Sequence, residues 1–218
     1  MKIDANTISI LKNFSKINPS IIIHPGNVLR TVSITKTIMA KANVTTVFDR
    51  KFAIYNLDRF ISTLSLFNEP ELDFKEKFVT VSEGNKKTNY VYADEETIKV
   101  KPPEKDIVLP SVDVSFKLTN DNLKNVEKAL SVLGLPEIVV SGDGTNINLQ
   151  AADVKNPSGD VYSIVIGETD KTFKAVFKSE NIKIIPGDYD VSICSKGISY
   201  FKNDTVEYFI AVESTSSF

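Results

Sequence analysis

The sequence has very little of the chemistry on which most enzymes and metal sites depend. It holds one cysteine, one histidine and no tryptophan among its 218 residues. A single thiol can form neither a disulfide within the chain nor a cysteine-based zinc site. Cys194 falls in an apolar alternation, and His24 directly precedes Pro25-Gly26. We therefore expect a buried, inert thiol and a turn histidine, and no histidine-dependent catalytic scheme.

Long apolar runs are also missing. The longest, such as Ile21–Ile23 and Phe209–Val212, are far too short to span a bilayer. No apolar stretch follows Met1-Lys2, so we expect no secretory signal and a reducing intracellular compartment. The only Gly-rich turn, Gly142-Asp143-Gly144, lacks the lysine and the helix of a phosphate-binding loop. We predict that the chain is not an enzyme and needs no cofactor and no metal.

Charge is unevenly distributed along the chain. The formal net charge is only −2, but residues 1–109 carry 16 basic against 13 acidic side chains, and residues 110–218 carry 10 against 15. This is not the balance of a protein that binds nucleic acid through bulk positive charge. Any nucleic-acid role must come from a local basic surface.

The hydrophobic pattern predicts an α+β fold made mainly of short antiparallel strands. Turn signals recur between apolar segments, and Asp143-Gly144 is the strongest of them, because it tolerates positive φ. Apolar residues at helical spacing predict three helices and a weaker fourth: Thr7–Asn18, Leu57–Phe67, Asn120–Leu133 and Ser179–Ile184.

The first half of the chain resembles the second. Leu11, Lys12, Phe14 and Lys16 correspond to Leu123, Lys124, Val126 and Lys128 at a constant offset of 112 residues. Between the halves, the segment 99–110 contains three prolines and five charges, which is typical of an extended connector. The sequence thus predicts two similar domains, 1–105 and 106–218.

Lysine pairs on the predicted helices are the best functional signal. Lys12 and Lys16 are four residues apart and share one helical stripe, as do Lys124 and Lys128. Either pair alone fits an ordinary solvated helix face. Their repetition at the same place in both halves favours a surface that holds a polyanion, on a chain that is acidic overall.

The sequence resembles the sliding clamps of T-even-type bacteriophages, the DNA polymerase processivity factors. The resemblance rests on four segments in the same order and at similar spacing, together with the terminal Phe218: Thr7–Asn18, Ala53–Phe60, Ile184–Tyr189 and Tyr208–Glu213. It implies two similar clamp-fold domains per chain and a homotrimeric ring, with antiparallel sheets outside and helices lining the hole. Such a ring encircles duplex DNA without sequence preference and tethers the replicative polymerase.

The resemblance also implies two sets of site residues. Those that would face the DNA are Lys12, Lys16, Arg59, Lys124, Lys128, Lys178 and Lys183. Those that would line a pocket for a partner's peptide are Val32, Ile107, Val108, Leu109, Pro186, Phe209 and Ala211. Val32 fits a buried strand position better, and Phe209 can equally turn into the core. An ATP-driven clamp loader is the other implied partner, no membrane is involved, and the cytoplasm of an infected bacterium is the implied location.

A β-rich trimeric structural or interaction protein of a virion is the alternative. It would share the composition, the short strands and the lack of a catalytic set. It would not need lysine pairs repeated on two helices, nor a two-copy layout. A particle with a central hole wide enough for a duplex supports the clamp, and a solid particle excludes it.

Overall fold

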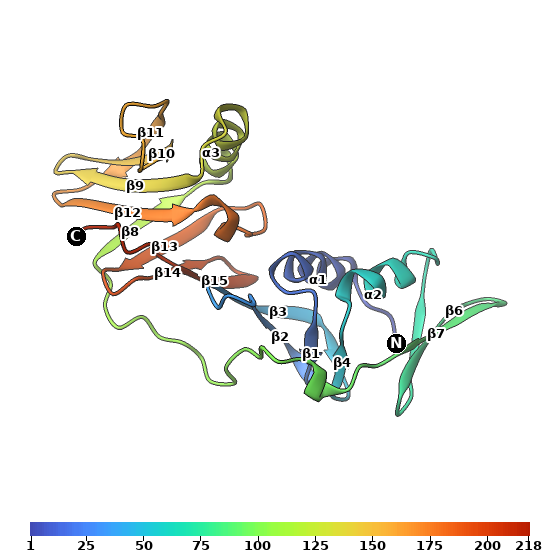
Figure 1. Cartoon of the computed structure of the whole chain (residues 1–218). Coiled ribbons are helices and arrows are strands. Elements are labelled where there is room, and N and C mark those ends of the chain that lie inside the picture. The colour runs from blue at the N-terminus through green and yellow to red at the C-terminus, as the bar shows by residue number, and fades with distance from the viewer. The chain divides into compact units, whose positions relative to one another are not determined.

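The computed structural model describes residues 1–218 and divides into two compact units, Met1–Glu104 and Lys105–Phe218 (Figure 1). Each unit combines antiparallel strands with helices packed on them. No helix is long and apolar enough to cross a membrane.

Two helices carry the first unit's core contacts. Helix α1 (Ala5–Ile17) buries Leu11 and Phe14 completely, and α2 (Leu57–Leu64) buries Leu57 and Phe60 completely. Helix α1 begins two residues earlier than the sequence predicts. The reason is Asp4, whose carboxylate accepts a hydrogen bond from the Thr7 N–H and caps the helix. Pro19 follows the last turn of α1, and α2 packs against α1.

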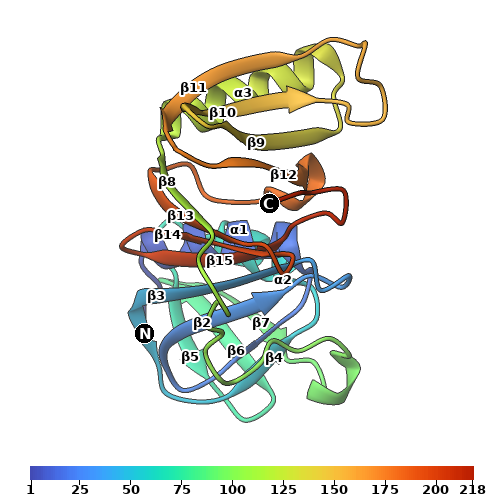
Figure 2. The same cartoon turned by 90° about the vertical axis from the view of Figure 1, so that its left-hand side faces the viewer.

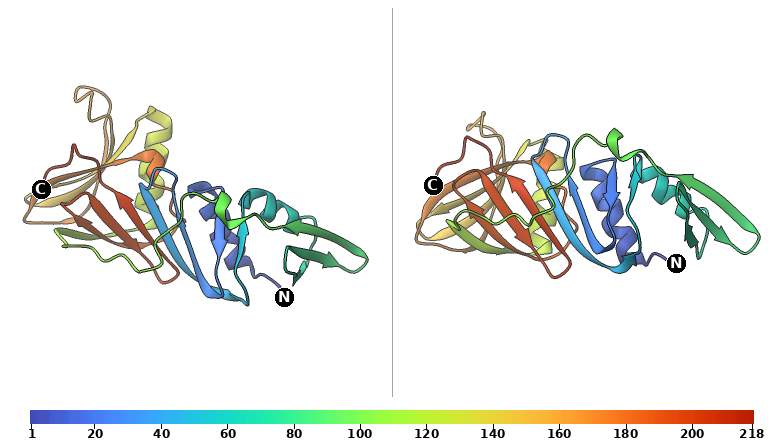
Figure 3. Two further views of the ribbon diagram at one scale, coloured as in Figure 1. Left: turned by 60° about the horizontal axis from the view of Figure 1, so that its bottom comes forward. Right: turned by 90° about the horizontal axis from the view of Figure 1, so that it is seen from below.

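The strands of the first unit form antiparallel pairs. They are β1 (Ile21–Ile23), β2 (Gly26–Val32), β3 (Ile38–Phe48), β4 (Phe52–Ile54), β5 (Glu71–Phe74), β6 (Phe78–Glu83) and β7 (Lys86–Val91). Strand β2 pairs with β3 and β1 with β4, and β1 lies against β2. Strands β5, β6 and β7 form a meander in that order, and the β6–β7 hairpin projects from the unit (Figure 3). A short 3-10 helix, η1 (Glu95–Thr97), follows.

The second unit has eight strands in two antiparallel groups. They are β8 (Val114–Leu118), β9 (Glu137–Asp143), β10 (Asn146–Ala152), β11 (Tyr162–Glu168), β12 (Thr172–Lys178), β13 (Tyr189–Cys194), β14 (Ile198–Lys202) and β15 (Val206–Ala211). One group runs β11-β10-β9-β12 and the other β15-β14-β13-β8. Helix α3 (Asn120–Leu133) packs on β9, β10 and β11 (Figure 2).

The bounds of α3 follow from its two ends. The Thr119 hydroxyl accepts the Asn122 N–H, and Gly134 adopts the left-handed conformation at φ 66° that ends the helix. The prediction for this helix is confirmed residue for residue. The predicted fourth helix is instead one 3-10 turn, η2 (Ser179–Asn181). Ile182 already has a non-helical backbone conformation, with φ −90° and ψ 73°, four residues before Pro186.

The segment around the β6–β7 turn differs from its prediction. The sequence predicts a loop over 82–87 and a strand over 90–93, whereas β7 covers Lys86–Val91 and Gly84-Asn85 make a tight turn. Strand β7 is polar on both faces and lies at the edge of its sheet, so it lacks the apolar alternation that identifies a half-buried strand. Residues 99–110, the predicted connector, and the three residues after it contain no helix or strand.

Candidate DNA-facing and partner surfaces

Helix α1 places its two lysines on the face opposite the core. Lys12 and Lys16 are exposed, whereas Leu11 and Phe14 of the same helix are buried. No acidic residue lies within the helix. The outward face therefore carries uncompensated positive charge along its exposed stripe.

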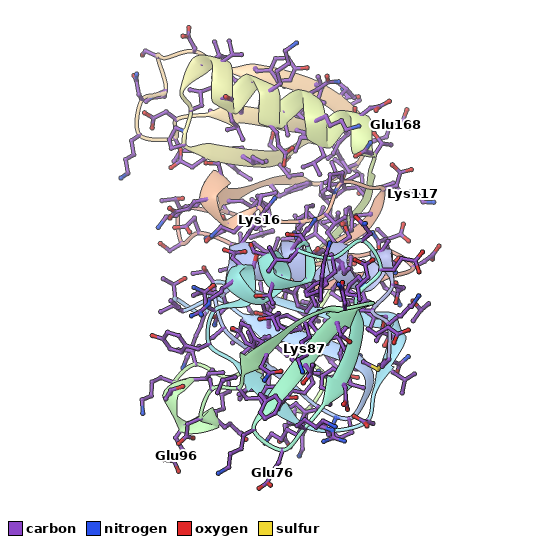
Figure 4. All side chains as sticks on the ribbon, turned by 90° about the vertical axis from the view of Figure 1, so that its right-hand side faces the viewer. Lys16, Glu76, Lys87, Glu96, Lys117 and Glu168 are labelled. Carbon is purple, nitrogen blue, oxygen red and sulfur yellow. The ribbon has the colours of Figure 1, made fainter.

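Helix α2 adds a third cation to the first unit. Arg59 is exposed, and its backbone N–H donates to the Asn56 side chain that caps the helix. Since α1 and α2 pack side by side, the structure brings Arg59 onto a helix adjacent to Lys12 and Lys16 (Figures 1 and 4). Asp58 lies next to Arg59 and dilutes the charge at that end.

Helix α3 repeats the arrangement in the second unit. Lys124 and Lys128 are exposed, and Leu123 and Val126 are buried on the opposite face. The Asp188 carboxylate accepts the Asn120 N–H at 2.7 Å, which holds the start of the helix. The two lysine pairs therefore occupy equivalent outward positions on α1 and α3.

The last two predicted DNA-facing residues differ from the helical ones. Lys178 ends β12, is exposed and lies 3.8 Å from the Glu213 carboxylate. Lys183 follows η2 and is half-buried, with a partner of its own within the protein. Neither stands on a helix face.

The predicted peptide-pocket residues differ widely in exposure. In the connector, Val108 is 82% exposed while Ile107 and Leu109 are half-buried. In the same unit Pro186 is exposed and Ala211 half-buried. The connector thus presents an apolar side chain to solvent, most openly at Val108.

Two of the pocket predictions fall on buried residues. Phe209 is 6% exposed, and its ring stacks on Tyr200 with centroids 4.7 Å apart. Val32 is 7% exposed, and its carbonyl accepts a hydrogen bond from the Asn18 side chain. Both side chains are therefore almost fully covered by protein atoms.

The first unit also contains an ion-pair cluster that sequence reasoning missed. Glu95 bridges Lys51 at 2.6 Å and Lys101 at 3.1 Å, and hydrogen bonds from these lysines hold the pKa of Glu95 below its usual value. The three side chains border a cavity of about 370 Å³ that His24 and Pro102 also line. No short sequence pattern reveals this cluster, because Lys51 lies 44 residues from Glu95 along the chain.

The single thiol lies among polar neighbours. Cys194 is buried, and its Sγ is 3.2 Å from the Ser111 Oγ, a contact that lowers the pKa of the thiol. The Ser111 hydroxyl also donates to the Asp113 carboxylate, which accepts the Ser195 N–H at 2.7 Å. This network ties the end of the connector to β13. No group of three or more His, Cys, Asp or Glu is arranged to hold a metal ion.

Two family models match the chain in succession. Residues 3–100 match the DNA polymerase processivity factor family, and residues 115–214 match the C-terminal part of the gp45 sliding clamp. Among curated relatives, the sliding clamp of Vibrio phage KVP40 is 39% identical over 98% of this chain and 100% of its own length. The sliding clamp of Escherichia phage RB69 is 28% identical over 100% of this chain and 99% of its own.

Solved structures share the fold at much lower identity. A PCNA2–PCNA3 complex from Sulfolobus tokodaii superposes with a TM-score of 0.70 at 12% identity, covering 97% of this chain and 98% of that one. PCNA of A. fulgidus, bound to the C-terminal region of FEN-1, gives 0.69 at 14% identity over 96% of both chains. The fold is therefore the sliding-clamp fold, and this chain belongs to the bacteriophage sliding-clamp family of DNA polymerase processivity factors.

Proposed function

We propose that three copies of this DNA sliding clamp form a ring that encircles duplex DNA, with α1 and α3 of each copy facing the phosphates. The observation that carries the proposal is the lysine pair repeated on two helices, outward and opposite the buried face in both units. Lysine ammonium groups bind phosphate as point charges, so such contacts are independent of sequence. A ring triples every contact, so that modest charge per chain suffices.

The strand order supports the proposal that the two units are copies of one domain. In the second unit the groups run β11-β10-β9-β12 and β15-β14-β13-β8. In the first unit β3, β2, β1 and β4 lie in the matching order, and β7-β6-β5 matches the second group. The hydrogen bond between Met1 and Leu72 of β5 in the first unit occupies the position of the β8–β13 pairing in the second unit. We place the boundary of these domains at residues 105 and 106.

The DNA-facing assignment is tested by reversing one lysine in each unit. We expect Lys12→Glu with Lys124→Glu to shorten the products of primed-template synthesis by polymerase, loader and clamp, since both cations are removed from the same proposed surface. The matched control is Lys117→Glu with Lys155→Glu, which reverses two exposed lysines outside the helices. Product length equal to that of the wild type in the helix variant would contradict the assignment.

A second surface is proposed for the polymerase. Val108, 82% exposed between two half-buried apolar neighbours, offers an anchor point for a partner's apolar side chain. Ile107, Leu109, Pro186 and Ala211, which belong to the same unit as Val108, complete the proposed pocket, and the buried Phe209 of that unit supports it. In the A. fulgidus PCNA structure, the bound partner is the C-terminal region of FEN-1.

The peptide pocket is tested with Leu109→Ala and Phe209→Ala. Truncation of an anchor residue in an interface costs more than about 1 kcal/mol of binding. We expect Leu109→Ala to weaken binding of a polymerase C-terminal peptide without changing the melting temperature. Phe209→Ala should lower stability, because the ring is buried. Unchanged affinity in the Leu109 variant would remove the connector from the pocket.

The remaining partners follow from the ring. A closed ring needs an ATP-driven loader to open it around DNA, and the clamp itself neither binds nor hydrolyses nucleotide in this proposal. The cytoplasm of the infected bacterium is the proposed site of action, because the DNA and the polymerase are there. Electron microscopy gives the direct test of the architecture: a ring with a hole wide enough for a duplex is expected, and a solid particle would favour the virion alternative.

A further inference from the structure

The strands β1 and β2 of the first unit have a second face, opposite the helices. Helix α1 packs on β2 and β3, and α2 packs on α1. Ile23 and Leu29 are buried, whereas Ile22, Val28 and Arg30 in the same two strands are half-buried. Because successive side chains of a strand point to opposite faces, these three half-buried residues lie on the face away from the helices.

The cavity of about 370 Å³ lies on this second face. Ile22, Val28 and Arg30 line it from the strands, and residues 101–104 line it from the start of the connector. In Figure 1, η1 and the start of the connector lie below β1 and β4, whereas α1 lies above them. All of the lining residues belong to the first unit, so the cavity is complete within that unit. In the proposed ring the helices face the duplex, so the ligand of this cavity is not the encircled DNA.

Three charged side chains in the cavity carry a net positive charge. One oxygen of the Glu95 carboxylate contacts the Lys51 ammonium at 2.6 Å, and the other contacts the Lys101 ammonium at 3.1 Å. One carboxylate cannot neutralise two ammonium groups, and Arg30 and Glu104 add one charge of each sign to the lining. Each ammonium has three N–H donors, and both lysine side chains are 44% exposed. The pair of lysines can therefore bind a second carboxylate beside Glu95.

The rest of the lining is largely apolar. Besides Ile22 and Val28, it includes the proline rings of residues 25, 102 and 103. Proline-rich segments and aromatic side chains pack well on one another, as in the recognition of proline-rich peptides. Ligand sites of about 300–1,000 Å³ combine such apolar walls with a few polar groups that fix the orientation of the ligand. The cavity thus fits an aromatic side chain that lies next to a negative charge.

We infer that this cavity is a second partner site, where an acidic peptide segment of another protein places a carboxylate on Lys51 and Lys101 and an adjacent aromatic side chain against the prolines. A bound carboxylate would connect Lys101 of the connector to Lys51, which lies between β3 and β4. Occupancy would therefore hold the start of the connector in place. The inference rests on the proposed function only for placing the duplex on the other face of the unit.

A tryptophan-containing peptide tests the charge contact. The protein contains no tryptophan, so the fluorescence of a capped peptide of alternating glutamate and tryptophan reports its binding to the full chain without DNA. We expect Lys101→Gln to weaken binding about three- to fivefold, the value of one partly exposed ion pair. The matched control is Lys99→Gln, since Lys99 is exposed two residues away and does not line the cavity. A peptide with glutamine in place of glutamate should bind more weakly than the acidic one.

Three further measurements test the location of the site. Val28→Phe takes up space in the cavity and should weaken binding, with thermal melting to establish that the variant is folded; Lys101→Gln carries the test if it is not. Bound peptide should slow hydrogen exchange in residues 99–104 of the wild type. An excess of the polymerase C-terminal peptide should not displace the acidic peptide, because the proposed connector pocket is a different site.

Four results would overturn the inference: no binding to the wild type, equal affinity for the glutamine peptide, equal losses in the Lys99 and Lys101 variants, or displacement by the polymerase peptide. Unchanged affinity in a folded Val28→Phe variant would do the same. The measurements need neither DNA nor a ring. A solid particle in electron microscopy would therefore remove the proposed ring and leave this site standing, whereas absence of peptide binding would remove only this site.

Discussion

The cap of α1 is held by an acid whose removal should destabilise the first unit. One Asp4 oxygen accepts the Thr7 N–H at 2.9 Å, and the other accepts the hydroxyls of Thr7 and Thr46. The carboxylate therefore caps the helix and ties it to β3. Burial acts to raise the pKa of Asp4, but the hydrogen bonds from Thr46 and Thr7 outweigh it and hold the pKa well below its usual value.

We expect Asp4→Ala to lower the free energy of unfolding by about 2–3 kcal/mol at pH 7. Loss of an N-cap costs about 0.5–2 kcal/mol, and each hydrogen bond to a charged group contributes about 1.5–3 kcal/mol, but the terms share one side chain and do not add fully. Urea unfolding followed by circular dichroism measures the change. Asp204→Ala, an exposed acid in the β14–β15 turn, is the control and should have little effect.

The pH dependence gives a second, independent reading of the same contact. Since the pKa of Asp4 is lowered by folding, its contribution is fully present above the unfolded value of about 3.9 and is lost as the pH falls below it. The difference between wild type and Asp4→Ala should therefore shrink when unfolding is repeated near pH 3. A difference that is the same at both pH values, or below about 0.5 kcal/mol at pH 7, would refute the reasoning.

Three further substitutions probe other parts of the fold. Gly142→Ala would place a Cβ 2.5 Å from both the Lys171 carbonyl oxygen and the Phe173 ring, so we expect a loss of about 1–3 kcal/mol in urea unfolding. Tyr208→Phe would remove the hydroxyl that accepts the Ile185 N–H at 3.1 Å, and leaving that donor without a partner should cost about 1–3 kcal/mol in the same assay. Glu95→Gln should weaken the attachment of Lys101, which we expect to see as faster hydrogen exchange in residues 99–104, with no change in exchange in the second unit. Unchanged protection there would show that the ion pair does not hold the connector.

Local signals predicted the elements that position the lysines. Thr119 and Gly134 define the ends of α3, and the spacing of Leu123, Val126 and Leu130 defines its buried face. The outward direction of Lys124 and Lys128 then follows from helical geometry alone. The family resemblance supplied the function, and the comparisons with known clamps confirm it.

Features that depend on distant contacts could not be predicted. The Glu95 cluster depends on Lys51, which lies in the turn between β3 and β4. No short sequence pattern shows that this turn lies beside Glu95. The sequence of β7 resembles that of a loop. An edge strand without a buried face does not require apolar and polar residues to alternate. The Asp4 cap, in contrast, depends on a local signal, because an acidic residue before an apolar helical stretch is a recognised N-cap.

The composition of the outward face of α1 has a consequence for motion along DNA. Beside its two lysines the helix exposes small residues such as Ser9, and the Ser15 hydroxyl already donates to the Lys12 carbonyl at 3.0 Å. It has no aromatic ring to stack on a base and no guanidinium fork to bind a phosphate through two bonds. An ammonium group can exchange one phosphate for the next without breaking a directional contact. In the proposed ring, a duplex threaded past this face would meet a nearly level energy profile, so thermal diffusion alone would move the clamp, with friction set by water and counterions.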